Sequence, residues 1–124
     1  MEDKDESHKK YQDLEERTFQ FAKRCRDYVK KLPHTLSNIE YGKQLIRSSG
    51  STGANYIEAN ERLGTKDFYH KIKICRKEAK ESRMWLRLTI PNKSEENEQQ
   101  ALIQEALELT KIFSAIVRNS GVQK

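Results

Sequence analysis

The sequence has few of the residues that cross-link or interrupt a polypeptide, with two cysteines, two prolines and five glycines among 124 residues. Two cysteines are too few for the disulfide framework of a small secreted domain. With so few prolines and glycines, the composition suits long helices better than disorder, because the apolar residues recur with a clear period. No apolar run approaches the length of about 18 residues that spans a bilayer, and the charged N-terminus has no hydrophobic signal segment. We therefore expect one cytoplasmic domain without membrane association.

The two cysteines, Cys25 and Cys75, both fall on the apolar stripes of expected helices. In a cytoplasmic protein such residues are most simply buried thiols that pack in the core. A disulfide or a redox pair is the alternative that the sequence leaves open.

Histidine is also scarce, which bears on metal binding. The three histidines are His8, His34 and His70. Di-metal helical bundles take a Glu-x-x-His motif from each of two helices, but this chain has no such motif, and Asp67-x-x-His70 occurs once. We therefore expect no metal site and no cofactor.

One stretch, Ser48-Ser-Gly-Ser-Thr-Gly53, resembles a phosphate cradle. A phosphate-binding loop follows a strand and ends in Lys-Ser or Lys-Thr, and neither feature is present here. With no candidate for nucleophilic catalysis either, we expect a protein that is not an enzyme.

What the chain does have is abundant charge, 35% of its residues, and apolar residues that recur with a helical period. Residues 1–7 are mostly charged and are expected to form a flexible N-terminal tail. The first helix should then extend to Pro33, which disfavours helix in the residue before it. Its apolar stripe, spaced by three and four residues as a core-facing helix requires, comprises Tyr11, Leu14, Thr18, Phe21, Cys25, Tyr28 and Leu32.

The second helix is expected over residues 37–63, with Ser37 as its N-cap. Three glycines inside it (Gly42, Gly50 and Gly53) each cost about 1 kcal/mol relative to alanine. A helix broken at this point would leave part of the core uncovered, so we predict a continuous helix. Its expected stripe comprises Ile39, Gly42, Ile46, Ser49, Gly53, Tyr56, Asn60 and Leu63.

Two further helices complete the expected fold. The third begins after Gly64 with Thr65 as N-cap and ends before Pro91, and the fourth is capped by Ser94 and ends at Gly121. Four helices of similar length, joined by short loops, predict an all-α, antiparallel up-down-up-down four-helix bundle domain over residues 8–121. The apolar stripes are Phe68, Ile72, Cys75, Ala79, Ser82 and Leu86 in the third helix, and Leu102, Ala106, Leu109, Phe113, Ile116 and Ser120 in the fourth.

The net charge of +5 is concentrated in the third helix, because residues 64–91 contain eight basic and three acidic residues. Seven of the basic residues lie on one side of that helix when it is wound at about 100° per residue. Such a surface is typical of proteins that bind a phosphate backbone, so RNA or DNA is the predicted ligand. The alternative is a solvated surface whose cations pair with the acids of the fourth helix: Glu95, Glu96, Glu98, Glu105 and Glu108. The seven basic residues are Lys66, Lys73, Arg76, Lys77, Lys80, Arg83 and Arg87.

The other flank of the third helix combines apolar and acidic residues. Ile74, Trp85 and Leu88 lie on it and form either a wider core or a subunit interface, since aromatic residues are favoured at interface centres. A polar cluster is expected where the second and third helices face each other, with ion pairs and hydrogen bonds that set their register. Its members are Arg47, Asn55, Glu58, Glu78 and Glu81.

The sequence resembles the small bacterial proteins encoded by intervening sequences in large-subunit ribosomal RNA genes. The resemblance runs from about Phe19 to Gly121 and rests on Ile46-Arg-Ser-Ser49, Gly53-Ala-Asn-Tyr-Ile-Glu-Ala59, Lys66-Asp-Phe68, Lys77-Glu-Ala-Lys-Glu-Ser82 and Trp85-Leu86. It implies a four-helix bundle that assembles into a ring-like pentamer, which favours the interface role for Ile74, Trp85 and Leu88. Related accessory proteins of diversity-generating retroelements associate with nucleic acid and with a reverse transcriptase, so a reverse transcriptase or another protein is a possible partner. The self-assembling scaffold without a nucleic-acid ligand is the alternative. Gly50, followed by Ser51 and Thr52, departs from the family pattern.

Overall fold

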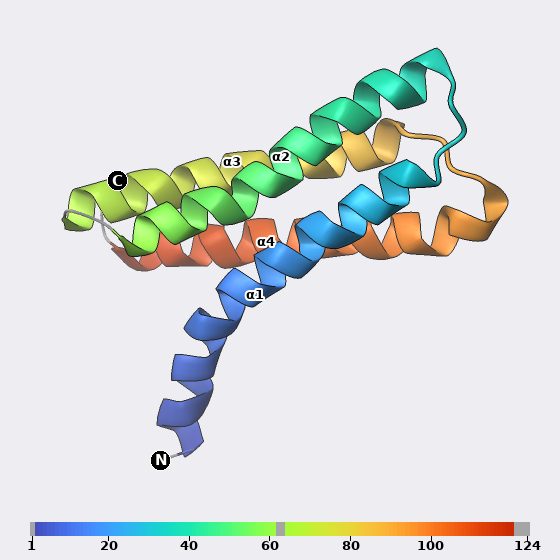
Figure 1. The fold of residues 1–124 in the computed structure, drawn as a ribbon. Coiled ribbons are helices and arrows are strands. Elements are labelled where there is room, and N and C mark those ends of the chain that lie inside the picture. Colours follow the sequence, from blue (N-terminus) through green and yellow to red (C-terminus); the bar gives the residue numbers. More distant parts are fainter. Residues whose placement is uncertain (1, 62–63, 121–124) are drawn as a thin grey trace.

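The computed structural model describes residues 2–61 and 64–120, and their side chains from residue 14 to 61 and from 64 to 119. These residues form the helices α1 (Glu2–Lys30), α2 (Leu36–Asn60), α3 (Thr65–Leu88) and α4 (Glu96–Ser120), with the short 3-10 helix η1 (Lys93–Glu95) before α4. Consecutive helices run in opposite directions (Figure 1). The predicted all-α, antiparallel up-down-up-down bundle is confirmed.

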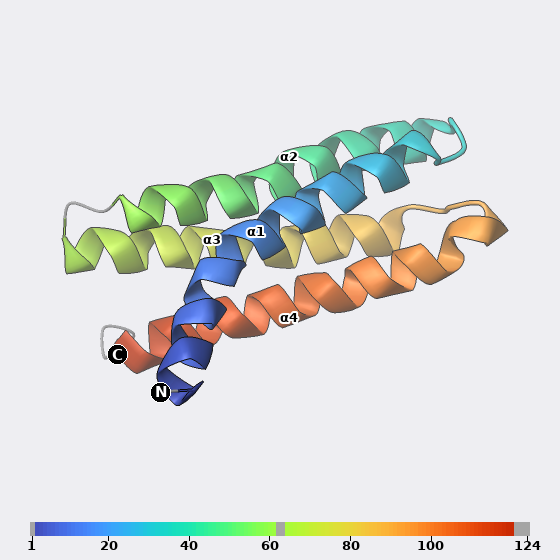
Figure 2. The same ribbon diagram turned by 60° about the horizontal axis from the view of Figure 1, so that its bottom comes forward.

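The four helices do not pack equally. Helix α3 lies along both α2 and α4, whereas α1 packs against α2 and more lightly against α4. The N-terminal part of α1 diverges from the other three helices (Figures 1 and 2). Helix α1 also begins at Glu2, and thus includes residues 2–7, because no glycine or proline interrupts the chain before Pro33. Whether residues 1–7 behave as a tail separate from a domain at 8–121 stays a prediction.

The apolar stripes of α1, α3 and α4 form the core. Every described residue of the predicted α1 stripe is buried, from Leu14 to Leu32. In α4 the buried stripe ends with Val117, and Ile116 packs against the core from its edge. Cys25 and Cys75 are free and buried, which confirms the core-packing interpretation of both.

Helix α2 runs unbroken through Ser48–Gly53, as predicted, but its buried face differs from the expected one. Ile39, Ile46 and Asn60 were expected inside and are exposed, while Leu63 lies outside the described residues. The prediction was wrong here because most of the interior positions hold small residues. The buried residues of α2 are Asn38, Gly42, Leu45, Ser48, Ser49, Thr52, Tyr56 and Ala59.

Small hydroxyl side chains can line this interior because each of them finds an acceptor. The Thr52 hydroxyl donates to the Ser48 carbonyl at 2.9 Å, and the Ser48 and Ser82 hydroxyls bond each other at 2.7 Å between α2 and α3. Buried polar groups cost little when they are hydrogen-bonded in this way. The isoleucines of α2 are thereby displaced to its outer surface.

The predicted N-caps were wrong by one or two residues. Thr35, rather than Ser37, caps α2, where its hydroxyl accepts a hydrogen bond from the Asn38 amide at 3.2 Å. Thr65 is the first residue of α3 after the N-cap Gly64, and Ser94 lies within η1. Two hydroxyl residues, Thr35 and Ser37, lie at the start of α2, and only the backbone conformation selects the one that caps. Helix α2 ends at Asn60 with Glu61 as C-cap, and the terminator predicted at Gly121 lies outside the described residues.

Candidate nucleic-acid interface

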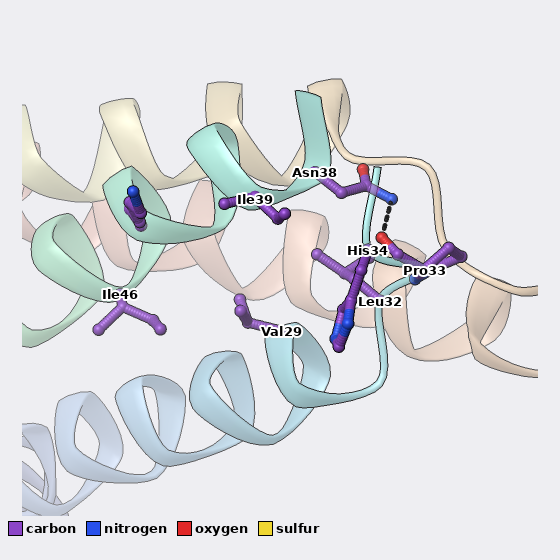
Figure 3. A pocket seen from close by; sticks show the side chains of 8 residues that line it. Val29, Leu32, Pro33, His34, Asn38, Ile39 and Ile46 are labelled. Carbon is purple, nitrogen blue, oxygen red and sulfur yellow. Dashed lines mark hydrogen bonds between the residues drawn. The ribbon is translucent and has the colours of Figure 1, made fainter. Parts of the chain in front are cut away.

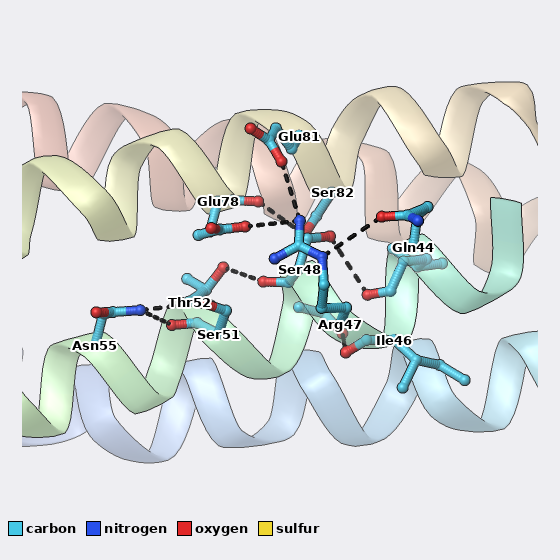
Figure 4. Close-up of polar contacts among 12 residues, drawn as sticks. Gln44, Ile46, Arg47, Ser48, Ser51, Thr52, Asn55, Glu78, Glu81 and Ser82 are labelled. Carbon is cyan, nitrogen blue, oxygen red and sulfur yellow. Dashed lines mark hydrogen bonds and ion pairs between the residues drawn. The ribbon is translucent and has the colours of Figure 1, made fainter.

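One flank of α3 is joined to α2 by ion pairs. Arg47 of α2 lies 3.4 Å from Glu78 and 3.2 Å from Glu81 (Figure 4). Lys71 of α3 lies 2.9 Å from Glu58 of α2. The structure thus brings together Arg47, Glu78 and Glu81 of the predicted polar cluster. Glu58 pairs instead with Lys71, which the sequence analysis did not single out.

The remaining member of that cluster, Asn55, bonds within its own helix. Its amide donates to the carbonyl and hydroxyl oxygens of Ser51 at 2.9 and 3.0 Å (Figure 4). The link between α2 and α3 that sequence reasoning missed is the Ser48–Ser82 hydrogen bond. A serine on an apolar stripe was the only signal for it.

The seven predicted nucleic-acid-binding residues form the opposite side of α3, which we call the basic face. Four of them are exposed and three are partly exposed. Within the part of the chain that the structure describes, none of the seven forms an ion pair. The exposed residues are Lys66, Lys77, Lys80 and Arg87, and the partly exposed ones are Lys73, Arg76 and Arg83.

Two acids of α4 bind arginines of α1 rather than residues of the basic face. Arg17 binds Glu105 through two hydrogen bonds of 2.7 and 2.9 Å, and Arg24 binds Glu98 through two of 3.0 Å. These hydrogen bonds raise the pKa of both guanidinium groups.

Two further ion pairs involve acids of η1 and α4. Lys31 lies 3.8 Å from Glu95 of η1, and Lys111 lies 4.0 Å from Glu108 within α4. Among the described residues, the ion pairs of Glu95, Glu98, Glu105 and Glu108 are therefore formed with residues outside α3, which disfavours the alternative in which these acids neutralise it. The charge of the basic face is left available to a ligand or to another chain.

The predicted interface residues occupy three different environments. Trp85 stacks on Tyr41 of α2 at a centroid distance of 5.8 Å and packs against the core. Ile74 is partly exposed, and Leu88 is 42% exposed. The assignment of these residues to an interface stays a prediction.

Burial of the two thiols bears on reactivity. Desolvation raises the pKa of Cys25 and that of Cys75 to about 12, so both are protonated at neutral pH. Because α2 is helical through Ser48–Gly53, the backbone amides there lie inside a helix and do not form a phosphate cradle.

The described residues contain no cluster of three or more histidine, cysteine, aspartate or glutamate side chains placed to hold a metal ion. Among the helices in residues 2–61 and 64–120, none is long and apolar enough to cross a membrane.

The fold and the basic face define the class of this protein as a helical bundle with one strongly cationic helix. The chain matches the family described as 23S rRNA-intervening sequence protein over residues 10–115. It is also similar to a protein of unknown function from the S23 ribosomal protein family of Bacteroides thetaiotaomicron VPI-5482, solved by crystallography at 1.70 Å resolution. The two share 30% sequence identity and a TM-score of 0.73, over 84% of this chain and 97% of that one.

Among curated proteins, none matches the chain. The family match spans most of the sequence, and the chain therefore belongs to the 23S rRNA-intervening sequence protein family. The resemblance described from the sequence is thereby confirmed.

Proposed function

We propose that this protein is a non-catalytic, self-assembling helical bundle that binds the phosphate backbone of RNA or DNA through the basic face of α3. The observation that carries the proposal is the set of seven cations on one side of α3, none of which forms an ion pair within the described residues. Unpaired surface cations are free to neutralise phosphates, and the counterions condensed on the nucleic acid are then released, which drives binding.

The dimensions of the basic face suit an extended polyanion. From Lys66 to Arg87 it spans about 31 Å along the helix axis, a length over which nucleic acid presents several phosphates. Tyr69 is the one aromatic residue interleaved with these cations, so base stacking contributes little. The expected mode is a contact with the backbone that does not read the sequence.

The descriptions of the related proteins favour including RNA among the ligands that are tested. The family description refers to 23S rRNA intervening sequences, and the solved relative is described as a member of the S23 ribosomal protein family. A reverse transcriptase remains a possible protein partner through the resemblance described above.

The experiment compares two variants of equal net charge. Lys66, Lys73, Lys80 and Arg87 are changed to glutamate in one, and the exposed Lys23, Lys30, Lys93 and Arg118 are changed to glutamate in the control. Binding to labelled RNA and DNA of about 20 nucleotides, single- and double-stranded, is measured by fluorescence anisotropy over a series of salt concentrations.

We expect the α3 variant to lose most of its affinity and the control to keep most of it. If the four cations contact phosphates, the slope of log K against log salt should fall by about 3 to 4 in the α3 variant. Equal losses in both variants would show that only net charge matters, and unchanged binding by the α3 variant would refute the role of the basic face.

The second candidate function is a protein scaffold without a nucleic-acid ligand. The apolar residues exposed on α1, α2 and α3 favour assembly with another protein surface. In that case the basic face pairs with the acids of a neighbouring chain. Such an assembly would dissociate at high salt, and the wild-type protein would bind none of the four nucleic-acid probes.

A further inference from the structure

The cations of the basic face form two straight rows along α3. Residues that are seven apart in a helix lie about 10.5 Å apart and nearly on one line parallel to the helix axis. The second row is displaced from the first by about 50° around the helix. The first row is Lys66, Lys73, Lys80 and Arg87, the second row is Arg76 and Arg83, and Lys77 lies beside the first row on the side away from the second.

The second row consists of arginines that are only partly exposed. Helix α2 lies on the flank of α3 that carries Glu81 and Trp85, so the second row lies toward α4. A guanidinium group can bind a phosphate through two parallel hydrogen bonds. The buried Nε of Arg83 has no hydrogen-bond partner among the described residues. An unpaired buried donor is unfavourable, and a phosphate reached by this side chain supplies the acceptor.

Contacts on both sides of α3 hold the two rows straight. The hydroxyl of Ser48 in α2 bonds that of Ser82 at 2.7 Å, and the Gln99 amide of α4 donates to the Leu86 and Thr89 carbonyls at 2.9 and 3.0 Å. The rows therefore form a fixed line of charge about 31 Å long. A duplex is stiff over about 150 base pairs and can lie along such a line, whereas a flexible single strand must first be ordered, at a cost in entropy.

Among the described residues, the basic face offers no free aromatic surface for unpaired bases. Proteins that bind single strands stack successive bases on aromatic side chains. The ring of Tyr69 already packs edge-on against Phe68 at a centroid distance of 5.0 Å. An apolar hollow of about 190 Å³ lies between α1 and α2, away from the basic face, and Figure 3 shows the aliphatic Val29, Ile39 and Ile46 pointing toward it.

We infer that the basic face lies along a groove of a double-stranded nucleic acid, with the first row on the phosphates of one strand and the second row on those of the other. At the ends of long side chains, a displacement of about 50° separates the rows by about 5 to 8 Å. The minor groove of B-DNA is about 6 Å wide. The inference rests on the proposed function and adds to it the double-stranded form of the ligand and the division of the cations between its strands.

The first test neutralises phosphates rather than residues. Three DNA duplexes of about 20 base pairs are compared, one with all its phosphates and two in which uncharged methylphosphonates replace the phosphates of one strand or of the other. Binding to the wild-type protein is measured by fluorescence anisotropy over a series of salt concentrations.

We expect each half-neutral duplex to bind at least about tenfold more weakly than the charged duplex at about 0.1 M salt, with a slope of log K against log salt reduced by about a third or more. A charged single strand of the same length should also bind at least about tenfold more weakly than the charged duplex. Contact with one strand only predicts a loss of about twofold, because one usable strand remains of two.

The second test removes one row of cations. Arg76→Gln and Arg83→Gln are combined in one variant, and Lys23→Gln and Lys93→Gln, at exposed positions outside the basic face, form the control of equal charge. The variant should bind one strand only, so neutralising one strand should cost it about twofold, while the control keeps the wild-type loss. Circular dichroism must show wild-type helicity for both, and where the variant fails this check the wild-type measurement decides.

The outcomes separate this inference from the proposed function. A loss of only about twofold with each half-neutral duplex, or a single strand that binds the wild type as tightly as the duplex, would overturn the inference and leave the basic face as a binding surface. A row variant that keeps the full wild-type loss would overturn the division of the rows between the strands. The proposed function fails differently, through a wild type that binds none of the fully charged probes.

Discussion

The side chain of Asn38 forms two hydrogen bonds with the backbone of Ile90. Its carbonyl oxygen accepts from the Ile90 amide at 2.9 Å, and its amide donates to the Ile90 carbonyl at 2.9 Å. The same amide donates to the Pro33 carbonyl at 3.0 Å. One residue at the start of α2 thus joins the loop after α1 to the chain after α3.

Replacing Asn38 by alanine should destabilise the protein by about 2 kcal/mol, because polar backbone groups would lose partners in a partly buried site. Asn38→Asp should also destabilise it, since a carboxylate cannot donate to the two carbonyls. Urea denaturation measures both. Ser37→Ala, at the exposed neighbouring position, is the control and should change stability by less than about 0.5 kcal/mol. Equal effects of Asn38→Ala and Ser37→Ala would contradict the role of Asn38.

The glycines Gly50 and Gly53 should respond in opposite directions to alanine. A Cβ atom at Gly53 would lie 3.0 Å from the Thr18 hydroxyl, which is buried and held by the Leu14 and Glu15 carbonyls. A Cβ atom at Gly50 would meet nothing within 4 Å. We therefore expect Gly53→Ala to destabilise by about 1 to 3 kcal/mol, and Gly50→Ala to stabilise by up to about 1 kcal/mol through helix propensity.

Thermal and urea unfolding, at a concentration where light scattering gives both glycine variants the same mass, measure this difference. A stabilising Gly53→Ala would show that α1 and α2 do not approach closely at this point. A destabilising Gly50→Ala would show that another surface already occupies the space beside it.

The two buried thiols should be inert in the folded protein. A pKa raised from 9.0 to about 12 lowers the thiolate fraction of Cys25 and Cys75 about a thousandfold at a given pH. At pH 8 we expect intact-mass spectrometry to show no alkylation by iodoacetamide in native buffer and two adducts in urea. Rapid native modification of either residue would contradict their burial.

The same shifts set the alkaline stability. The folded state keeps thiol protons that the unfolded state releases above pH 9, so this contribution is complete below pH 9 and is lost as the pH rises toward 12. The midpoint of urea denaturation should therefore fall with increasing pH in that range. A Cys25→Ala, Cys75→Ala variant should show a smaller fall, and an equal fall would assign the effect to other groups.

The sequence predicted helices more reliably than the faces they bury. The α1 stripe from Leu14 to Leu32 was correct because large apolar residues there repeat with an unambiguous period. In α2, Ile39 and Ile46 suggested the wrong face, since hydropathy alone places isoleucine inside and serine outside. Ser48, Ser49 and Thr52 are buried because their hydroxyls find acceptors, and the chain's periodicity contains no information about such acceptors.

For the candidate site, too, the sequence predicted some features and not others. The basic face lies on a single helix, so the helical repeat of 3.6 residues was enough to identify its seven residues from the sequence. Whether those cations are neutralised depends on other helices. Glu98 and Glu105 bind Arg24 and Arg17 of α1, and no pattern along the chain shows which neighbour an acid will face.

By itself, therefore, the sequence determined the four helices, their antiparallel order, the buried cysteines and the concentration of positive charge on one side of α3. These properties follow from local periodicity, charge and short loops. Only the tertiary structure decided which face of α2 enters the core, which residues cap the helices and with which cations the acids of α4 pair. Each of these depends on contacts between residues distant in the chain, which packing and hydrogen bonding select only when the helices come together.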